Sequence, residues 1–209
     1  MVTITSYGKD IEPNVPEKNK VIEAFKILSS RVGKEAIGWR YDPIFYGNGF
    51  NFERHIAEFE NLASALKDYT DSCVLSFLDL YMKVQRNALN IYPSNIEEQK
   101  ALCQKFTDIA KANGMTVKTC CGSERKWQCM NVRIRARSNC LLGSDIGAYD
   151  SCRHLCRYCY ANMDKERVLK NMQQHDPMSP FLIGNSQPGD KVTEAKQKNC
   201  RVKQISLFE

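Results

Sequence analysis

The chain has 209 residues, of which 43% are hydrophobic and 26% are charged, so it has enough apolar mass to bury a core. No stretch approaches the ~20 apolar residues that a membrane span needs, and the N-terminus lacks the basic start and apolar core of a signal peptide. Of the net charge of +6, residues 120–139 carry +4, and no basic stripe runs along a helix as a nucleic-acid-binding surface requires.

The chain contains ten cysteines and no export signal. Without export, cysteines in this number indicate a reducing compartment and metal chemistry rather than a disulfide framework. We therefore expect a cytoplasmic protein that has no membrane partner.

The first predicted elements are a strand, a helix and a second strand. Residues 2–6 alternate and are β-branched, which is typical of a strand. The next apolar residues recur every three or four positions and predict a helix that Gly33 ends; they are Val21, Phe25, Leu28 and Val32. Residues 36–41 form the second predicted strand, which Asp42-Pro43 stops.

Two further helix–strand pairs follow. Asn51 is the predicted N-cap of a helix that extends to residue 66, and residues 73–78 form the third strand. Ser94-Asn-Ile-Glu97 is a capping-box sequence that opens a third helix. Asn113-Gly114 ends that helix, and residues 115–119 form the fourth strand.

This strand–helix rhythm predicts an α/β fold with a parallel sheet. A complete eight-stranded barrel takes ~250 residues, and the rhythm stops after four strands. We therefore expect residues 1–120 to form about half of a TIM-barrel-like repeat. Residues 121–139 are an irregular basic linker, and residues 140–209 are a cysteine-rich, loop-rich extension with a short helix that Asp164 caps.

The carboxyl ends of parallel strands usually form the working face of such a fold. The polar candidates for a substrate face at those ends are Tyr7, Arg40, Asp42 and Asp79. The alternative for Arg40 and Asp42 is that they pair with each other. Cys73 and Cys103 fall within a strand and a helix, where we expect them to be buried as small hydrophobic residues.

Three cysteines stand close together in Cys152-Arg-His-Leu-Cys156-Arg-Tyr-Cys159. Thiolates are soft ligands that select iron–sulfur clusters, zinc or copper(I). The spacing Cys-x3-Cys-x2-Cys, with Tyr158 before the last cysteine, resembles the signature of the radical S-adenosylmethionine (radical SAM) superfamily. That resemblance implies a 4Fe–4S cluster with one open iron that SAM chelates, and a role for Tyr158 in packing near the adenine.

A structural metal site is the competing interpretation of the same cysteines. A zinc knuckle would take His154 or Cys140 as its fourth ligand, and a closed iron–sulfur site would do the same. A closed site leaves no position for SAM, so the two interpretations imply different proteins: an enzyme with an unknown small-molecule or macromolecular substrate, or a non-catalytic metal module.

Several stretches together resemble domain of unknown function family 1848. They are Tyr7–Pro13, Trp39–Pro43, Ser76–Asp79, Asp145–Tyr149, Cys152–Asn162 and His175–Pro180. The resemblance implies a TIM-barrel-like domain followed by a cysteine-rich segment, and its cysteine run is similar to that of spore photoproduct lyase. It implies no substrate.

Family members usually carry further strands before the point where this chain starts, and they differ from it in residues 121–139. These departures predict a chain truncated at its N-terminus, which is an inactive fragment or else completes its barrel as a homodimer. An exposed sheet edge would favour self-association.

Overall fold

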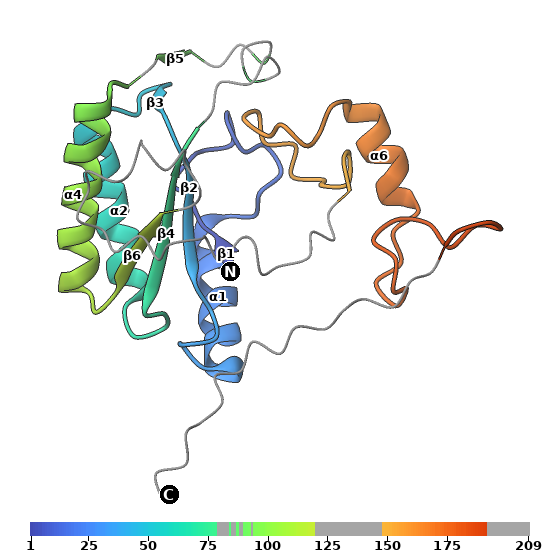
Figure 1. The fold of residues 1–209 in the computed structure, drawn as a ribbon, viewed down its shortest axis with the longest axis horizontal. Coiled ribbons are helices and arrows are strands. Elements are labelled where there is room, and N and C mark those ends of the chain that lie inside the picture. The colour runs from blue at the N-terminus through green and yellow to red at the C-terminus, as the bar shows by residue number, and fades with distance from the viewer. Residues whose placement is uncertain (79–83, 85–86, 88–89, 93, 120–147, 192–209) are drawn as a thin grey trace, which may run out of the picture.

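In a computed structural model of the chain, the residues whose structure is described are 1–78, 84, 87, 90–92, 94–119 and 148–191. The main sheet has four parallel strands in the order β1-β2-β4-β6. Their bounds are Val2–Thr3, Trp39–Ile44, Ser72–Phe77 and Thr116–Thr119. The predicted parallel βα repeat is therefore confirmed (Figure 1).

The two faces of this sheet differ in polarity. The face toward the helices carries buried apolar side chains, which include Ile4, Trp39, Tyr41, Cys73, Leu75 and Val117. A row of paired residues crosses the four strands and alternates with these buried apolar residues: Thr3, Arg40, Val74 and Lys118. Because successive side chains of a strand point to opposite faces, this row lies on the face away from the helices.

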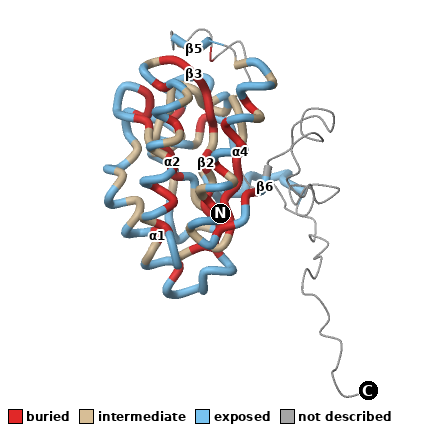
Figure 2. Tube along the Cα trace, turned by 90° about the vertical axis from the view of Figure 1, so that its left-hand side faces the viewer, coloured by how far each residue is buried: buried red, intermediate tan, exposed pale blue. Residues whose placement is uncertain are grey.

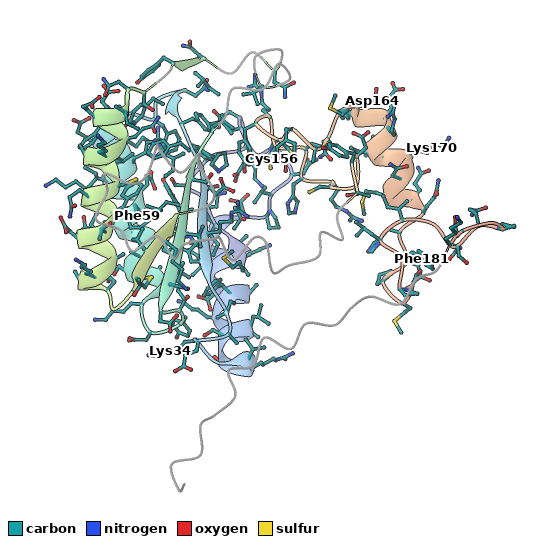
Figure 3. The ribbon with its side chains drawn as sticks, in the orientation of Figure 1. Lys34, Phe59, Cys156, Asp164, Lys170 and Phe181 are labelled. Atoms are coloured by element: carbon teal, nitrogen blue, oxygen red, sulfur yellow. The ribbon has the colours of Figure 1, made fainter. Side chains whose placement is uncertain are left out.

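Three helices cover the apolar face: α1 (Lys18–Val32), α2 (Phe52–Leu66) and α4 (Ile96–Ala112). Phe59 of α2 and Phe106 of α4 stack with ring centroids 4.1 Å apart, and Trp39 stacks on Phe59 at 4.8 Å. Figure 3 shows Phe59 between the helices and the sheet, and Figure 2 shows the buried residues concentrated in this layer. Cys73 and Cys103 are fully buried in the same core, as predicted.

The helix ends follow the sequence signals, with one shift. Asn51 caps α2 as predicted, since its side chain accepts a hydrogen bond from the Arg54 backbone N–H. The cap of α4 is Asn95 and not Ser94: Asn95 and Glu98 exchange both hydrogen bonds of a capping box. The box is therefore displaced by one residue from its predicted position.

Two other sequence expectations need correction. The predicted apolar face of α1 is only partly buried, because Phe25 and Ser29 enter the core while Leu28 and Val32 remain 42% and 49% exposed. Strand β2 does not stop at Asp42-Pro43 but continues to Ile44, with a register shift between Tyr41 and Ile44. Proline cannot donate to the ladder, so the strand passes it only by shifting register.

A small second sheet was not predicted. It pairs β3 (Tyr46–Gly47) antiparallel with β5 (Ile91–Tyr92), beyond the carboxyl end of β2. Strands of two residues leave too short a pattern to be recognised in a sequence.

The described C-terminal residues, 148–191, form loops around one helix, α6 (Lys165–Gln173), which Asp164 caps as predicted. Figure 1 shows α6 well to one side of the sheet. Asp150, only 2% exposed, accepts hydrogen bonds from the backbone N–H groups of Met163 and Asp164 and so joins the start of α6 to the segment before the cysteines. None of the helices in the described ranges is long and apolar enough to cross a membrane.

Candidate functional site: the cysteine loop on the β1–α1 loop

The loop that carries Cys152, Cys156 and Cys159, called here the cysteine loop, lies against the loop between β1 and α1. The Arg157 backbone N–H donates to the Ile11 carbonyl at 2.9 Å. The side-chain amide of Asn14 donates to the Arg153 carbonyl at 2.8 Å. These bonds join backbone segments that are about 140 residues apart in the chain.

Arg157 extends this contact with its guanidinium group. Nη1 donates to the Asp10 carbonyl at 3.1 Å, and Nη2 donates to the Asn87 carbonyl. The side-chain amide of Asn87 donates in return to the Arg157 carbonyl. The planar fork of arginine suits this role, because it directs several donors at fixed angles.

Beneath the cysteine loop lies a second apolar cluster, separate from the main core. Its buried members are Tyr7, Ile11, Phe45, Phe50 and Val84, and Tyr158 packs against it. The Tyr158 ring lies 6.0 Å from the Tyr7 ring and 6.3 Å from the Phe45 ring, within the range of favourable aromatic contacts. The cysteine loop is therefore anchored by packing as well as by hydrogen bonds.

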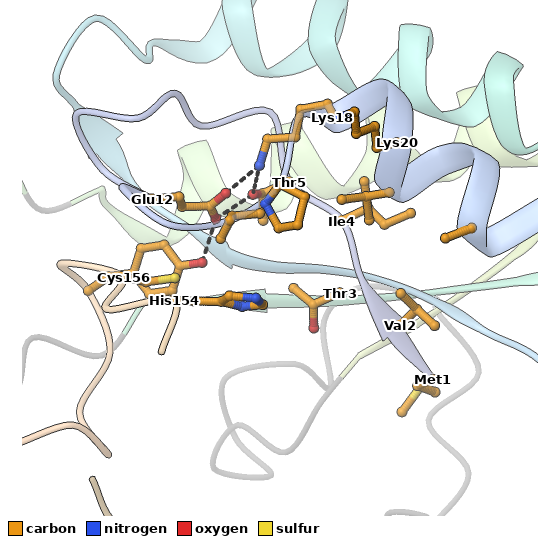
Figure 4. A pocket seen from close by; sticks show the side chains of 15 residues that line it. Met1, Val2, Thr3, Ile4, Thr5, Glu12, Lys18, Lys20, His154 and Cys156 are labelled. Carbon is orange, nitrogen blue, oxygen red and sulfur yellow. Dashed lines mark hydrogen bonds and ion pairs between the residues drawn. The ribbon is translucent and has the colours of Figure 1, made fainter. Parts of the chain in front are cut away.

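A buried charged group next to the loop is Glu12, which is 3% exposed. Its Oε1 accepts hydrogen bonds from the Tyr158 hydroxyl at 2.5 Å and from the Thr5 hydroxyl at 2.6 Å. Its Oε2 forms an ion pair with the Lys18 ammonium group, as the dashed lines in Figure 4 show. A buried carboxylate needs such compensation, and here its donors come from three separate segments.

Among the three cysteines, Cys152 is exposed while Cys156 and Cys159 are partly buried. The Cys159 backbone N–H donates to the Cys156 carbonyl at 3.0 Å, so the last two cysteines bracket a tight turn. Burial is the main cause that raises the pKa of Cys156 to about 11. The motif therefore combines one exposed thiol and two partly buried thiols on one loop.

A pocket of about 630 Å³ adjoins this thiol (Figure 4). One wall is β1 and the start of α1, including Val2, Ile4, Val21 and Ala24. The opposite wall is the cysteine loop, which contributes His154, Cys156 and Tyr158. Lys18, Lys20 and Glu12 add charge to a lining that is otherwise largely apolar.

The structure brings only some of the predicted ligands together. His154 lines the same pocket as Cys156, whereas Cys140 lies outside the described residues. Over the described ranges, no group of three or more His, Cys, Asp or Glu side chains has the arrangement of a metal site.

The residues predicted at the strand ends as a substrate face do not line this pocket in the described structure. Tyr7 is buried and donates to the Pro43 carbonyl at 2.8 Å, so its hydroxyl is used within the core. Arg40 and Asp42 form an ion pair at 2.9 Å, the alternative considered from the sequence. Burial raises the pKa of Asp42, while Arg40 and Ser76 lower it. Asp79 lies outside the described residues.

Sequence reasoning missed two residues that the structure makes prominent. One is Glu12, a carboxylate in a loop with no motif of its own. The other is His55 in α2, which is fully buried, with Nδ1 3.1 Å from the Tyr41 hydroxyl and Nε2 2.9 Å from the Phe45 carbonyl. Burial lowers the pKa of His55 to about 4. His55 sits in a helix with a clear apolar face, and that face was the available signal.

The comparisons with known proteins identify a family and go no further. No curated protein and no solved structure matches the chain. The family model "Domain of unknown function (DUF1848)" matches residues 1–134, which include the βα repeat and end before the cysteine loop. The match covers more than half of the chain, and the protein therefore belongs to this family of unknown function.

Proposed function

We propose that the protein binds a metal centre, a 4Fe–4S cluster, through Cys152, Cys156 and Cys159. The observation that carries the proposal is the position of the three-thiol motif. The motif lies on a loop that hydrogen bonds and aromatic packing hold against the strand-end side of the sheet, and its middle cysteine borders a pocket. Such thiols require a reducing setting, so we place the protein in the cytoplasm.

The donor set suits a soft metal centre. All three groups are thiols, which is the ligand type of iron–sulfur clusters, and they stand within eight residues of one loop. Since a thiol must lose its proton to bind metal, cluster assembly would release protons and would favour neutral to alkaline conditions.

The pocket supports an open site, in which the three cysteines leave one metal position for an added ligand. SAM is the ligand that the spacing of the motif implies, and it would supply radical chemistry at the cluster. The residues of this chain would bind and orient that ligand, with apolar walls from β1 and α1 that limit water.

A closed structural site, with zinc or an iron–sulfur cluster, is the second candidate. The observation that favours it is the position of His154, whose side chain shares the pocket with Cys156. Three thiols and one imidazole form a common four-coordinate zinc set. In this case the metal would tie the C-terminal segment to the sheet and would take no exogenous ligand.

The test is anaerobic reconstitution of the full chain with iron and sulfide, followed by EPR spectroscopy of the reduced protein with and without SAM. A 4Fe–4S signal that shifts on addition of SAM is the expected result. A signal that SAM does not change would favour the closed site. Recovery of zinc without any cluster would refute the iron–sulfur proposal.

Cysteine variants assign the ligands in the same experiment. Replacement of Cys152, Cys156 or Cys159 by alanine should abolish the signal, whereas Cys103→Ala removes a thiol of the main core and should leave it intact. His154→Ala separates the two candidates, because it should release the metal only from a closed site.

A further inference from the structure

The bonds around Glu12 suggest a role that the cysteine motif does not reveal. Thr5 follows β1 and Lys18 begins α1, so these two donors lie close to Glu12 in the chain. The third donor, the Tyr158 hydroxyl, is 146 positions away, in the cysteine loop. Glu12 is therefore the point at which a buried charge links the sheet to the cysteine loop.

Tyr158 brings this link close to Cys156 in the cysteine loop. A tyrosine hydroxyl has one proton to donate, and that of Tyr158 goes to Glu12 at 2.5 Å. Tyr158 stands two positions after Cys156 in the cysteine loop, and both residues line the pocket. Holding the Tyr158 hydroxyl therefore holds the part of the loop that carries Cys156.

We infer that Glu12 is the positioning residue of the cysteine loop: it holds the Tyr158 hydroxyl and thereby keeps the loop that carries Cys156 at the edge of the pocket. Hydrogen bonds of Arg157 and Asn14 also attach the loop, but they go to the carbonyl groups of Asp10 and Arg153 and not to a cysteine side chain. Any effect of Glu12 on metal binding rests on the proposed function. Its effect on the docking of the loop does not depend on a metal.

The inference is tested first on the metal-free full chain, by hydrogen exchange of the peptide that spans residues 152–160. Three amides in it are bonded in the docked loop: Arg157 N–H to Ile11, Cys159 N–H to Cys156 and Cys152 N–H to the Asn162 side chain. Glu12→Ala and Tyr158→Phe should each speed exchange of this peptide about tenfold or more, the effect expected for loss of a hydrogen bond to a charged group. Peptides from α2 and α4 should be unchanged.

Two variants separate positioning from charge. Glu12→Gln removes the charge but keeps an oxygen that can accept from Tyr158, so it should protect the loop nearly as well as the wild type. Glu17→Gln removes an exposed carboxylate that pairs with Lys9 in the loop between β1 and α1, and it is the matched control. Loss of protection in Glu12→Gln equal to that in Glu12→Ala would overturn the hydrogen-bond role.

Pulsed maleimide labelling reports on the thiol itself. In Glu12→Ala we expect faster labelling of Cys156 with Cys73 and Cys103 still protected, since both are buried in the main core and report on global unfolding. If Glu12→Ala unfolds and exposes them, Tyr158→Phe decides alone through hydrogen exchange, because it keeps the ring packing and removes only the hydroxyl. Wild-type exchange of residues 152–160 in folded Tyr158→Phe would overturn the inference.

Reconstitution then shows what the position does for a metal centre. Hydrogen bonds and solvent exposure near the ligand sulfurs tune a cluster, so Glu12→Ala should alter the EPR line shape while Glu12→Gln should not. If the wild type takes up no cluster, the proposed function fails while the exchange result still stands. If exchange is insensitive to Glu12 but the cluster forms, only the positioning role fails.

Discussion

At the scale of single residues, several buried polar groups of the described structure have specific hydrogen-bond partners. Glu12 receives three donors, and both ring nitrogens of His55 are engaged, one with Tyr41 and one with Phe45. Tyr7 and Tyr41 are buried, and both hydroxyl groups are hydrogen-bonded. Burial raises the pKa of Tyr41 well above its ordinary value. Such groups specify one arrangement of the core, since each is costly to bury without its partner.

The stability of the protein should depend on pH through His55. Its pKa falls from 6.5 to about 4 on folding, so between these values the unfolded chain binds a proton that the folded protein does not. The free energy of unfolding should therefore fall as the pH falls, by about 2 kcal/mol between pH 7 and pH 5. Urea denaturation at the two pH values measures it.

His55→Gln is the control for this prediction, because glutamine can still donate to the Phe45 carbonyl but does not titrate. The variant should lose most of the pH dependence. Asp42, whose pKa is raised by burial, acts in the opposite direction at lower pH and is present in both proteins. An equal pH slope in the two proteins would contradict the assignment to His55.

At the scale of elements, the hydrogen bonds of an N-cap residue define where a helix begins. In α4, the Asn95 side chain accepts from the Glu98 backbone N–H at 2.8 Å, and the Glu98 carboxylate accepts from the Asn95 backbone N–H at 3.0 Å. Ser94, one residue earlier, instead accepts a hydrogen bond from the Gln99 side chain. The tertiary packing of α4 thus selects between two neighbouring residues that are both good caps.

Asn95→Ala should lower the free energy of unfolding by about 1 kcal/mol, the usual cost of removing an N-cap. Ser94→Ala is the matched variant and should cost less, because it removes only the bond to Gln99. Chemical denaturation of both variants gives the comparison. A larger loss of unfolding free energy for Ser94→Ala would indicate that Ser94, the position predicted from the sequence, is the cap.

At the scale of the whole molecule, the two apolar clusters stabilise different parts of the structure. The main core joins the sheet to α1, α2 and α4, and the second cluster joins the strand-end loops to Tyr158 of the cysteine loop. The first determines whether the βα repeat is folded, and the second determines where the cysteines lie. A variant can therefore affect one without the other.

Phe106→Ala removes a ring that stacks on Phe59 in the main core and should cost about 3–5 kcal/mol of stability. Leu169→Ala, at a half-exposed position of α6, should change stability by about 0.5 kcal/mol or less. Denaturation midpoints of the two variants compare them. A similar small effect at both positions would show that the aromatic stack does not hold the helices on the sheet.

The sequence by itself determined the parallel βα repeat, most helix ends and the cysteine motif. Each of these depends on residues that are near one another in the chain: apolar periodicity, a cap and its partner three positions later, or three thiols within eight residues. Such signals can be recognised without knowledge of the fold. Their exact boundaries can still be wrong: the cap of α4 is Asn95 and not Ser94, and β2 continues past Pro43.

Only the tertiary structure decided which polar residues meet. Glu12 and Tyr158 are separated by 146 positions, and neither the pairing of Arg40 with Asp42 nor the burial of His55 follows from spacing alone. The physical reason is that a buried polar group is satisfied by whichever donor the folded chain brings within hydrogen-bond distance. The local pattern marks where thiols stand in the chain, and long-range packing sets where the loop that carries them is held.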